Sequence, residues 1–402
     1  MKKNNSFLNT YSRYIKYWSI DTNYIFLNHG SFGATPIEIL KKQQIIRNQL
    51  ENEPVKFFIR DIEEQLFISK KKLAKFINAD VKDIAFIPNA TYGVNSVLKS
   101  LTFRKGDELL TTNHEYHSCK NTLDLVAKKN NSKVVVANIP FPPKSENEVI
   151  ETLLKYVTKK TRLLLIDHVT SPTGLVFPIE KITKEFESRG INVLVDGAHA
   201  AGMVDLKINK FKPSYYTGNC HKWLCTPKGS AFLYVRKDKQ KNIYPLITTY
   251  SDPQFEKGKW TVFQNRFYWL GTIDVSPFIC VGHTIDYLNK LYPNGLKGII
   301  EHNHSLAIQA RNVLSKALKI DLPIPDNMIG SLVSLPITDT KRKIFPSFYI
   351  DDLQNKLFYD YKIEVPIMFF PNPPKRVIRV SAQIYNSIKQ YEILKDILID
   401  IM

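Results

Sequence analysis

A lysine without charged neighbours lies in the stretch "GNCHKW" (218–223) of a chain in which lysine is otherwise common. Asparagine, cysteine, histidine and tryptophan surround Lys222, whereas the lysines of "SKKKL" and "KDKQK" lie among other charged residues. Keeping an ammonium group out of water costs free energy, so a lysine in such company calls for a functional reason. Lys222 is therefore a candidate for covalent chemistry through its amine.

A carboxylate lies at a matching distance along the chain. Asp196 ends the apolar run "VLVD" and precedes Lys222 by 26 residues, a spacing that fits two successive elements of one sheet. Taken alone, such an aspartate is typical of a turn or a helix cap. An acid and a semi-buried lysine at the same edge of a sheet suggest a ligand between them. Pyridoxal phosphate (PLP) fits, because a lysine forms its Schiff base and an acid keeps its ring nitrogen protonated.

The phosphate of such a cofactor needs an anion site. The stretch "PNATYGVNS" places Asn-Ala-Thr after a predicted strand and before a predicted helix. Backbone N–H groups at the start of that helix, with the Thr91 hydroxyl, would bind the phosphate. Taken alone, this pattern is a common helix cap. His221 would add a donor to the phosphate, and the alternative for His221 is a packed core histidine.

Composition and charge restrict the class of protein. The chain has 402 residues, of which 44% are hydrophobic, and this supports a large folded core. The net charge of +18 comes from scattered lysines without an Arg-rich arm or a base-reading helix, so we expect no nucleic-acid partner. The four cysteines form no C-x-x-C pair, which is typical of a reducing compartment. No apolar run suits a signal peptide or a membrane helix, so we expect a soluble, cytoplasmic protein without a membrane partner.

Short apolar runs that end in polar or glycine-containing residues recur along the first part of the chain, at 83–93, 107–116, 132–140, 161–174, 191–202 and 230–236. Helical stretches lie between them, so we expect a mostly parallel sheet covered on both faces, with ligands beyond the carboxyl ends of the strands. After about residue 275, two helices and several strands suggest a smaller α+β unit. We divide the chain into an N-terminal segment that packs on the small domain, a large PLP-binding domain and a small C-terminal domain, at 1–20, 21–278 and 279–402.

Several motifs together resemble the isopenicillin-N epimerase-like branch of the class V aminotransferase (cysteine desulfurase-type) family. They are "LNHGSFGATP", "NATYGVNSVL", "DHVTSPTGLVFPIEKI", "LVDGAHAAG", "YTGNCHKWLCTPKGSAFLYVR" and "WLGTIDVSP". The resemblance runs from about residue 24 to 275 and resumes at "RVIRVSAQIYN". It implies the α/β fold of PLP-dependent transferases of fold type I, with a seven-stranded, mostly parallel sheet in the large domain. It also implies a homodimer with shared active sites.

The resemblance implies a role for each matched residue of the cofactor site. Lys222 would hold the cofactor and carry the proton at Cα, Asp196 would pair with the pyridine nitrogen, and His199 would contact the phenolic oxygen. Thr272 would reach the phosphate of the neighbouring subunit. The other matched positions are on the phosphate side or near the substrate and the ring oxygen: Ala90, Thr91, Asn219 and His221 for the phosphate, and Ser171 for the ring oxygen.

The residue that stacks on the cofactor ring has three candidates in "NHEYHS". Tyr116 aligns with the stacking residue of the family, and His114 and His117 are the alternatives. Tyr116 or His117 would also supply the second acid that an epimerase needs. The spacing of "HEYH" is not the H-E-x-x-H of zinc enzymes, so we expect no metal site.

The substrate side rests on residues from both ends of the chain. Arg379 matches the arginine that binds the substrate α-carboxylate, a task suited to a bidentate guanidinium, and Arg376 is the alternative. Asn28 and His29 match the N-terminal segment that borders the substrate cleft. The family therefore implies an amino-acid-like small molecule as the substrate.

The chain departs from the cysteine desulfurases in one respect. Those enzymes carry a nucleophilic cysteine on a loop in the C-terminal third, whereas this chain has no cysteine after Cys280. Persulfide chemistry on such a loop is therefore not expected. Cys220 and Cys225 flank Lys222, and buried packing is the more common role for cysteines of this kind.

We expect PLP chemistry at the Cα of an amino acid through Lys222, in an epimerase-like reaction. A carbon–sulfur lyase or desulfhydrase that acts on cysteine or a cysteine conjugate is the first alternative, and an aminotransferase is the second. A non-catalytic basic binding protein that keeps the fold is the alternative from another class. The Lys, Asp, phosphate and carboxylate positions that the chain retains argue against this last interpretation.

Overall fold

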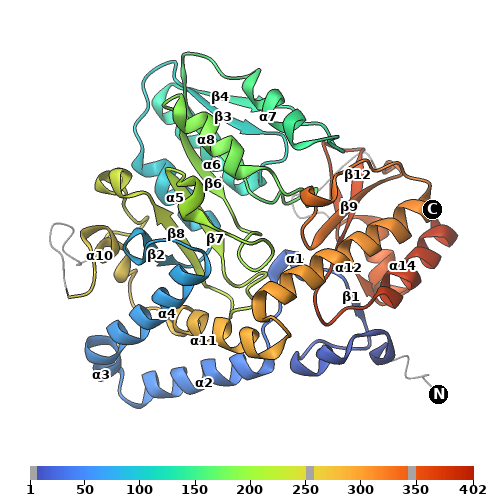
Figure 1. The fold of residues 1–402 in the computed structure, drawn as a ribbon, viewed down its shortest axis with the longest axis horizontal. Helices are drawn as coiled ribbons and strands as arrows, with labels where there is room; N and C mark the ends of the chain where they lie inside the picture. Colours follow the sequence, from blue (N-terminus) through green and yellow to red (C-terminus); the bar gives the residue numbers. More distant parts are fainter. Residues whose placement is uncertain (1–6, 250–257, 343–349) are drawn as a thin grey trace.

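The large domain is built around a seven-stranded sheet with the strand order β2-β8-β7-β6-β5-β3-β4. The computed structural model describes residues 7–249, 258–342 and 350–402 (Figure 1). Strand β8 runs antiparallel to both of its neighbours, whereas the other strands share one direction. The predicted α/β fold with a mostly parallel sheet is confirmed. The strands are β2 (Ile84–Ile87), β3 (Glu108–Thr112), β4 (Lys133–Ala137), β5 (Thr161–Asp167), β6 (Asn192–Asp196), β7 (Tyr215–Asn219) and β8 (Ala231–Val235).

Both faces of this sheet are buried. In β5, Leu163 and Leu165 pack in the core on one face, and Leu164 and Ile166 pack in the core on the other. This alternation is the two-residue period of a strand, and burial on both sides explains the continuous apolar run. One face is covered by α5 (Ala90–Ser100), α6 (His117–Asn130) and α10 (Val262–Tyr268), and the other by α4 (Ile62–Phe76), α7 (Glu146–Leu154), α8 (Ile179–Ser188), α9 (Ile208–Phe211) and α11 (Ser276–Leu291).

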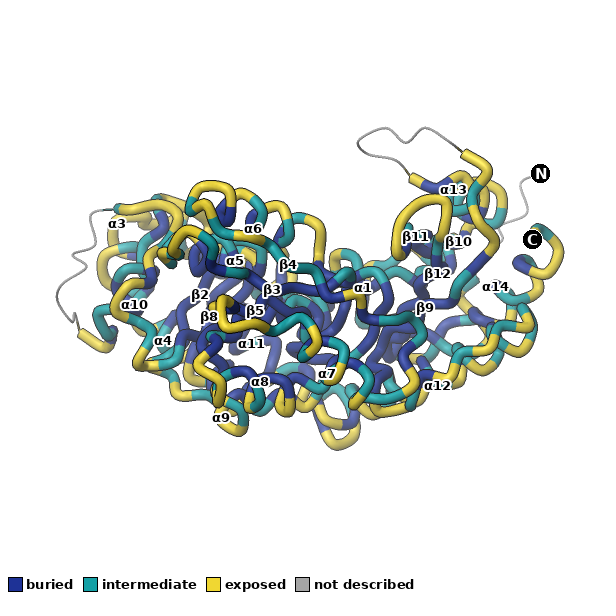
Figure 2. Tube along the Cα trace, turned by 90° about the horizontal axis from the view of Figure 1, so that it is seen from above, coloured by how far each residue is buried: buried dark blue, intermediate teal, exposed yellow. Residues whose placement is uncertain are grey.

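The small domain combines two sheets with long helices. Figure 2 shows buried residues along the centre of the molecule and exposed residues on the outer sides of α12 and α14. None of the helices in the described part of the chain has the length and apolarity to cross a bilayer. The elements are β9 (Leu332–Ile337), β11 (Ile367–Phe369) and β12 (Arg376–Ser381) in an antiparallel sheet, β1 (Ile25–Phe26) parallel to β10 (Ile363–Glu364), and α12 (Gly295–Leu318), α13 (Asp352–Tyr359) and α14 (Ile388–Ile401).

The N-terminal segment packs on the small domain. Ser12 donates from its backbone N–H to the carbonyl of Tyr385, and the rings of Trp18 and Tyr385 are 5.3 Å apart. Residues 1–6 lie outside the described residues. Because β1 pairs with β10, the attachment extends beyond the limit expected at residue 20. The short helix α1 (His29–Phe32) then leads toward the large domain.

The boundary expected between 278 and 279 falls inside a continuous helix. Helix α11 spans Ser276–Leu291 and packs against α4 and α2 (Ile37–Asn52), with α3 (Pro54–Lys56) following α2. These contacts tie α11 to the large domain. Helix α12 follows and packs against α14 and β9 as well as against α11, and the exact domain boundary stays a prediction.

Candidate active site

Polar residues gather at the carboxyl edge of the large sheet. Asp167 and Asp196 end the parallel strands β5 and β6 and are register partners, and Asn219 ends β7 beside them. Parallel strands bring their carboxyl ends to one edge, so the candidate residues that follow them converge there. The chain after β7 carries His221 and Lys222 before it returns as β8.

Lys222 lies half-buried in the loop between β7 and β8. Its Nζ is 3.1 Å from Nε2 of His199. Burial lowers the pKa of Lys222 to about 8, and the positive charge of Arg379 acts in the same direction while Asp196 opposes it. A larger fraction of Lys222 is therefore a neutral amine near pH 7 than for an ordinary lysine, which is the form that attacks a carbonyl.

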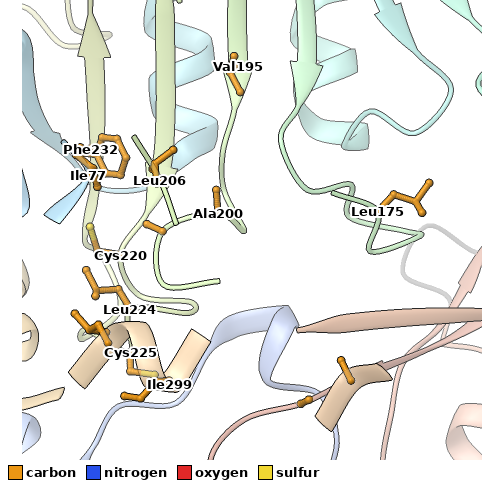
Figure 3. Packing of buried hydrophobic residues seen from close by; sticks show 14 of the residues in the cluster. Ile77, Leu175, Val195, Ala200, Leu206, Cys220, Leu224, Cys225, Phe232 and Ile299 are labelled. Carbon is orange, nitrogen blue, oxygen red and sulfur yellow. The ribbon is translucent and has the colours of Figure 1, made fainter. Parts of the chain in front are cut away.

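His29 holds the loop that carries Lys222 through a hydrogen bond to its backbone. His29 donates from Nε2 to the Lys222 carbonyl oxygen at 3.0 Å and accepts from the Tyr385 hydroxyl through Nδ1 at 2.8 Å. Both ring nitrogens of His29 are thus used within the protein, and the side chain is fully buried. His29 therefore supports the lysine loop from a buried position, and its expected contact with substrate stays a prediction. Apolar residues of the same loop pack among the core residues that Figure 3 labels, namely Cys220, Leu224 and Cys225.

Asp196 is buried at the bottom of the site. Its Oδ1 accepts the N–H of Ala198 at 2.9 Å, and its Oδ2 accepts the S–H of Cys119 at 3.2 Å. Two further buried carboxyls, those of Asp167 and Glu115, lie near it. Each has one oxygen without a hydrogen-bond partner among the described residues. Burial raises the pKa of Asp167 and Glu115, and the neighbouring carboxyls raise it further.

The phosphate side is formed by α5 and the end of β7. Asn89 caps the helix by accepting the Tyr92 N–H at 2.8 Å, and the Ala90 N–H donates to Oδ1 of Asn219 at 2.8 Å. The half-buried Thr91 lies in the first helical turn, where backbone N–H groups have no partner within the helix. Because the N–H groups of Ala90 and Tyr92 are bonded within the protein, the Thr91 N–H and hydroxyl are the candidate donors for an anion at this helix N-terminus.

His221 uses one ring nitrogen within the protein. Nδ1 donates to the Ser230 carbonyl at 3.0 Å, and burial lowers the pKa of His221 to about 4. Nε2 of the neutral ring therefore carries a lone pair rather than a proton. His221 can donate to a phosphate only after Nε2 takes up a proton, which a neighbouring phosphate dianion favours.

Arg379 is a buried guanidinium that pairs with no carboxylate among the described residues. Nη1 donates to the Ser171 carbonyl, Nη2 donates to Oγ of Ser31 at 3.2 Å, and Nε has no partner among the described residues. Burial lowers the pKa of Arg379 to about 10. Arg376 differs, because it already pairs with Asp351 at 2.6 Å. Of the two candidates, Arg379 has donors left for a ligand carboxylate.

Tyr116 and His117 line a pocket of about 710 Å³, together with Ser171 and residues 368–373. Tyr116 lies at the N-terminal end of α6 and is 42% exposed, so its ring is available to a ligand. His114 is fully buried and bonds through both nitrogens to Thr173 Oγ1 at 2.7 Å and to a backbone carbonyl. His114 is thus a packed residue, and the stacking candidates that face the pocket are Tyr116 and His117.

Two further expected residues, Asn28 and Thr272, have no contact with Lys222 among the interactions of the described residues. Asn28 donates to Oε1 of Glu364 at 2.9 Å and accepts from Ser31 at 2.5 Å, so it holds a neighbour of Arg379. Thr272 is exposed in the segment between α10 and α11. An exposed position suits a residue that serves a neighbouring subunit.

Sequence reasoning missed several residues of the site. Asp167 ends "LLLID" just as Asp196 ends "VLVD", so the same strand-end pattern could have revealed it. Glu115 and Ser31 had no such signal, because their neighbours come from distant parts of the chain. The sequence shows Trp223 only as a neighbour of Lys222, whereas in the structure its indole N–H donates to Nδ1 of His199 at 3.2 Å.

Residues 54–351 match the class V aminotransferase family. The chain therefore belongs to this family of PLP-dependent enzymes, and the predicted family and cofactor are confirmed.

Two curated relatives have names that correspond to the two leading predicted reactions. The chain is 28% identical over 405 residues to a probable L-cysteine desulfhydrase, chloroplastic, of Arabidopsis thaliana, with 94% of this chain and 82% of that protein covered. It is 27% identical over 390 residues to isopenicillin N epimerase of Streptomyces clavuligerus, with 94% and 95% covered. One similar solved structure is the cystine C–S lyase C-DES in complex with its reaction product cysteine persulfide. It matches with a TM-score of 0.79 at 20% identity, and the match covers 94% of this chain and 98% of that chain. This last likeness shows a shared fold.

The residues present fit PLP. Asp196 and the two incompletely bonded carboxyls beside it form a buried cluster whose pKa values are raised, and a protonated ring nitrogen would favour the ionised form of Asp196. The first turn of α5 offers the Thr91 N–H and hydroxyl to the phosphate, and Lys222 offers its amine to the aldehyde. Three distinct chemical groups of the cofactor thus have counterparts along one edge of the sheet.

Proposed function

We propose that this protein is a PLP-dependent enzyme that acts at the Cα of an amino-acid substrate, with an epimerase-like reaction as the first candidate. The observation that carries the proposal is the buried guanidinium of Arg379, which has no carboxylate among the described residues and lies close enough to Lys222 to lower its pKa. A free α-carboxylate supplies the missing charge.

Each residue then has a defined task. PLP, when bound, withdraws electrons from Cα and makes its proton acidic. Arg379 holds the α-carboxylate, and this places Cα near Lys222. The neutral amine of Lys222 takes the Cα proton or returns it, since a pKa of about 8 suits both directions near neutral pH. Tyr116 and His117, which line the pocket, are the candidates for a second acid that delivers a proton in epimerisation.

A carbon–sulfur lyase or desulfhydrase is the second candidate, because desulfhydrases are among the relatives that cover 94% of this chain. The same Lys222 and Arg379 would serve this reaction, and a thiolate at Cβ would leave once the Cα proton is removed. All four cysteines of the chain are buried, and burial raises the pKa of Cys225 to about 12. The proposal therefore uses no cysteine nucleophile of the protein.

The first experiment tests the cofactor lysine. Wild type, Lys222→Ala and the control Lys228→Ala are incubated with PLP, reduced with borohydride and digested for mass spectrometry. The control removes the next lysine of the same loop, whose Nζ bonds to the Gly33 carbonyl. We expect a pyridoxyl group on the Lys222 peptide in wild type and control, and none there in Lys222→Ala. Reduction that labels no lysine in wild type would contradict the proposal.

A second experiment separates the reactions. Amino acids and cysteine conjugates are incubated with the loaded enzyme in deuterated water. Deuterium at Cα of recovered substrate, with inversion of configuration, supports the epimerase. Release of pyruvate and a thiol supports the lyase. If no amino acid exchanges its Cα proton and the protein instead binds nucleic acid in a steeply salt-dependent way, the fold serves a binding function.

We further propose a homodimer in a reducing compartment. Large apolar side chains are exposed on α2, on the short helical segments at 54–61 and on α4, namely Ile45, Val55, Ile59 and Ile68. Exposed apolar groups of this size are common at interfaces between subunits. The four buried free thiols fit a compartment without disulfide formation.

A further inference from the structure

Two hydrogen bonds connect the side chains of Trp223, His199 and Lys222 in series. The indole N–H of Trp223 lies 3.2 Å from Nδ1 of His199, and Nε2 of His199 lies 3.1 Å from Nζ of Lys222. An indole nitrogen can only donate, so Nδ1 of His199 accepts and carries no proton. The pKa of His199 is lowered far below its usual range by burial, so the ring is neutral. Its single proton is therefore on Nε2.

This tautomer has a consequence for Lys222. A donor on Nε2 can bond to Nζ only when Nζ offers a lone pair, which means when Lys222 is a neutral amine. The opposite tautomer would accept from an ammonium group and would stabilise the charged form. The titratable and charged groups that face the pair from the surrounding elements are Arg379 of β12, Asp196 and Asp167 at the strand ends, Cys119 of α6, and His29 and His221.

Trp223, which begins this hydrogen-bonded series, is held rigidly. Trp223 is 1% exposed, and its ring lies 4.9 Å from the ring of His29. Its backbone is equally confined, because a Cβ at Gly202 would lie 2.5 Å from the Trp223 carbonyl. His199 is 2% exposed. The indole therefore has little freedom to turn away from Nδ1.

We propose that Trp223 is a positioning residue that fixes His199 as an Nε2–H donor and thereby keeps Lys222 a free amine. In the loaded enzyme the same N–H group would serve as a donor to the phenolic oxygen, for which His199 is the expected contact. This second half rests on the proposed function, whereas the first half concerns the protein without cofactor.

The variant Trp223→Phe tests the proposal. Its matched control is Trp260→Phe, because Trp260 is buried to a similar degree and its indole N–H has no partner among the described residues. The pKa of Lys222 is measured on the cofactor-free protein by competitive acetylation across pH, with the Lys222 peptide quantified by mass spectrometry. We expect Trp223→Phe to raise this pKa by roughly 0.5–1 unit and the control to leave it unchanged.

A double substitution shows whether the effect passes through the imidazole. In a His199→Gln background, Trp223→Phe should produce no further shift, because no tautomer remains to be set. A shift of equal size in both backgrounds would overturn the proposal. So would an unchanged pKa of Lys222 in a Trp223→Phe protein whose thermal midpoint matches that of the control.

Nitrogen NMR gives a measurement that needs no Trp223 variant. With His199→Gln used for assignment, the His199 signals of wild type should report a proton on Nε2 and a lone pair on Nδ1. A proton on Nδ1 would overturn the proposal even if Trp223→Phe fails to fold. Failure of the proposed function gives a different result, since wild type would then carry no pyridoxyl group on Lys222 while the tautomer and the pKa shift remained as expected.

Discussion

Two arginines on one strand, Arg379 and Arg376, have opposite electrostatic situations. Arg379 is 2% exposed and bonds only to neutral oxygen atoms among the described residues, whereas Arg376 pairs with the buried Asp351. A buried guanidinium without an anion is costly to keep in a fold. A fold retains such a group when a ligand supplies the anion, which makes Arg379 a binding residue and Arg376 a stabilising one.

Replacement of each arginine by lysine should therefore affect different properties. We expect Arg379→Lys to raise KM for an amino-acid substrate about 10- to 100-fold, because a bidentate contact becomes a point charge. Arg376→Lys should leave KM within about twofold and lower the thermal midpoint, since it weakens the pair with Asp351. Steady-state kinetics and thermal unfolding of both variants check this, and the reverse pattern would exchange the two assignments.

Asp167 carries a cost that only function explains. It is 3% exposed, its Oδ2 has no partner among the described residues, and burial together with Glu115 and Asp196 raises its pKa. An acid with a raised pKa in the folded state binds a proton that the unfolded chain releases. Its contribution to stability therefore falls as the pH rises from the unfolded pKa toward the folded one.

Asp167→Asn should accordingly stabilise the cofactor-free protein. At about pH 8 we expect a gain in unfolding free energy on the order of 1–2 kcal/mol, shrinking toward about pH 3, where aspartate is protonated in both states. Asp107→Asn is the control, since Asp107 accepts from the Arg104 N–H and pairs with Arg162, and it should destabilise. Urea unfolding across pH measures both, and a loss of stability in Asp167→Asn at every pH would show that the charge is compensated.

At the scale of elements, the stretch around α1 holds the loop that carries Lys222, in addition to the strands on either side of that loop. His29 bonds to the Lys222 carbonyl, and Thr35 Oγ1 donates to the Thr226 carbonyl at 3.0 Å. Gly33 lies between them with φ +71°, where a Cβ would be 2.9 Å from Cα of Lys222 and closer still to the His221 carbonyl oxygen. Only glycine fits this close approach.

Gly33→Ala should therefore displace the Lys222 loop. We expect loss of PLP attachment at Lys222 and a fall in thermal stability beyond the cost of the left-handed conformation. Gly106→Ala is the control, because Gly106 has φ +86° and nothing within 4 Å of an added Cβ. It should lose only about 1 kcal/mol of stability and keep full PLP attachment. Equal behaviour of the two variants would mean that the N-terminal segment does not position the lysine.

At the scale of the whole molecule, both ends of the chain meet at the substrate side of the site. Glu364 accepts from Asn28, Asn28 accepts from Ser31, and Ser31 accepts from Arg379. The chain of hydrogen bonds joins the N-terminal segment to two strands of the small domain. The placement of Arg379 thus depends on the docking of the small domain and of the segment before the large domain.

The proposed homodimer predicts complementation between damaged subunits. Thr272→Asp should weaken PLP binding, because its carboxylate would repel the phosphate of the neighbouring subunit. Mixed with Lys222→Ala subunits under exchange conditions, it should regain activity, since each mixed dimer contains one complete site. Light scattering checks for the dimer. A monomer, or a mixture without recovered activity, would contradict shared sites.

The sequence alone determined which stretches form strands, that polar residues follow these strands, and what chemistry those residues can perform. Apolar runs such as "LLLID" and "VLVD" have few stable alternatives to buried parallel strands, and parallel strands place Asp196, Asn219 and Lys222 at one edge whatever else the chain does. The family motifs lie in these same stretches. Fold, family and cofactor were predictable for this reason.

Only the tertiary structure decided the partners of the side chains. Arg379 meets Ser31 across 348 residues, and His29 meets Lys222 across 193. No local pattern reports contacts of this range. The family resemblance already favoured Arg379, but the different environments of Arg379 and Arg376, the packed role of His114 and the carboxyl cluster behind Asp196 were beyond the sequence. The proton on His199 depends on such a contact as well, because burial and a single donor from Trp223 determine it.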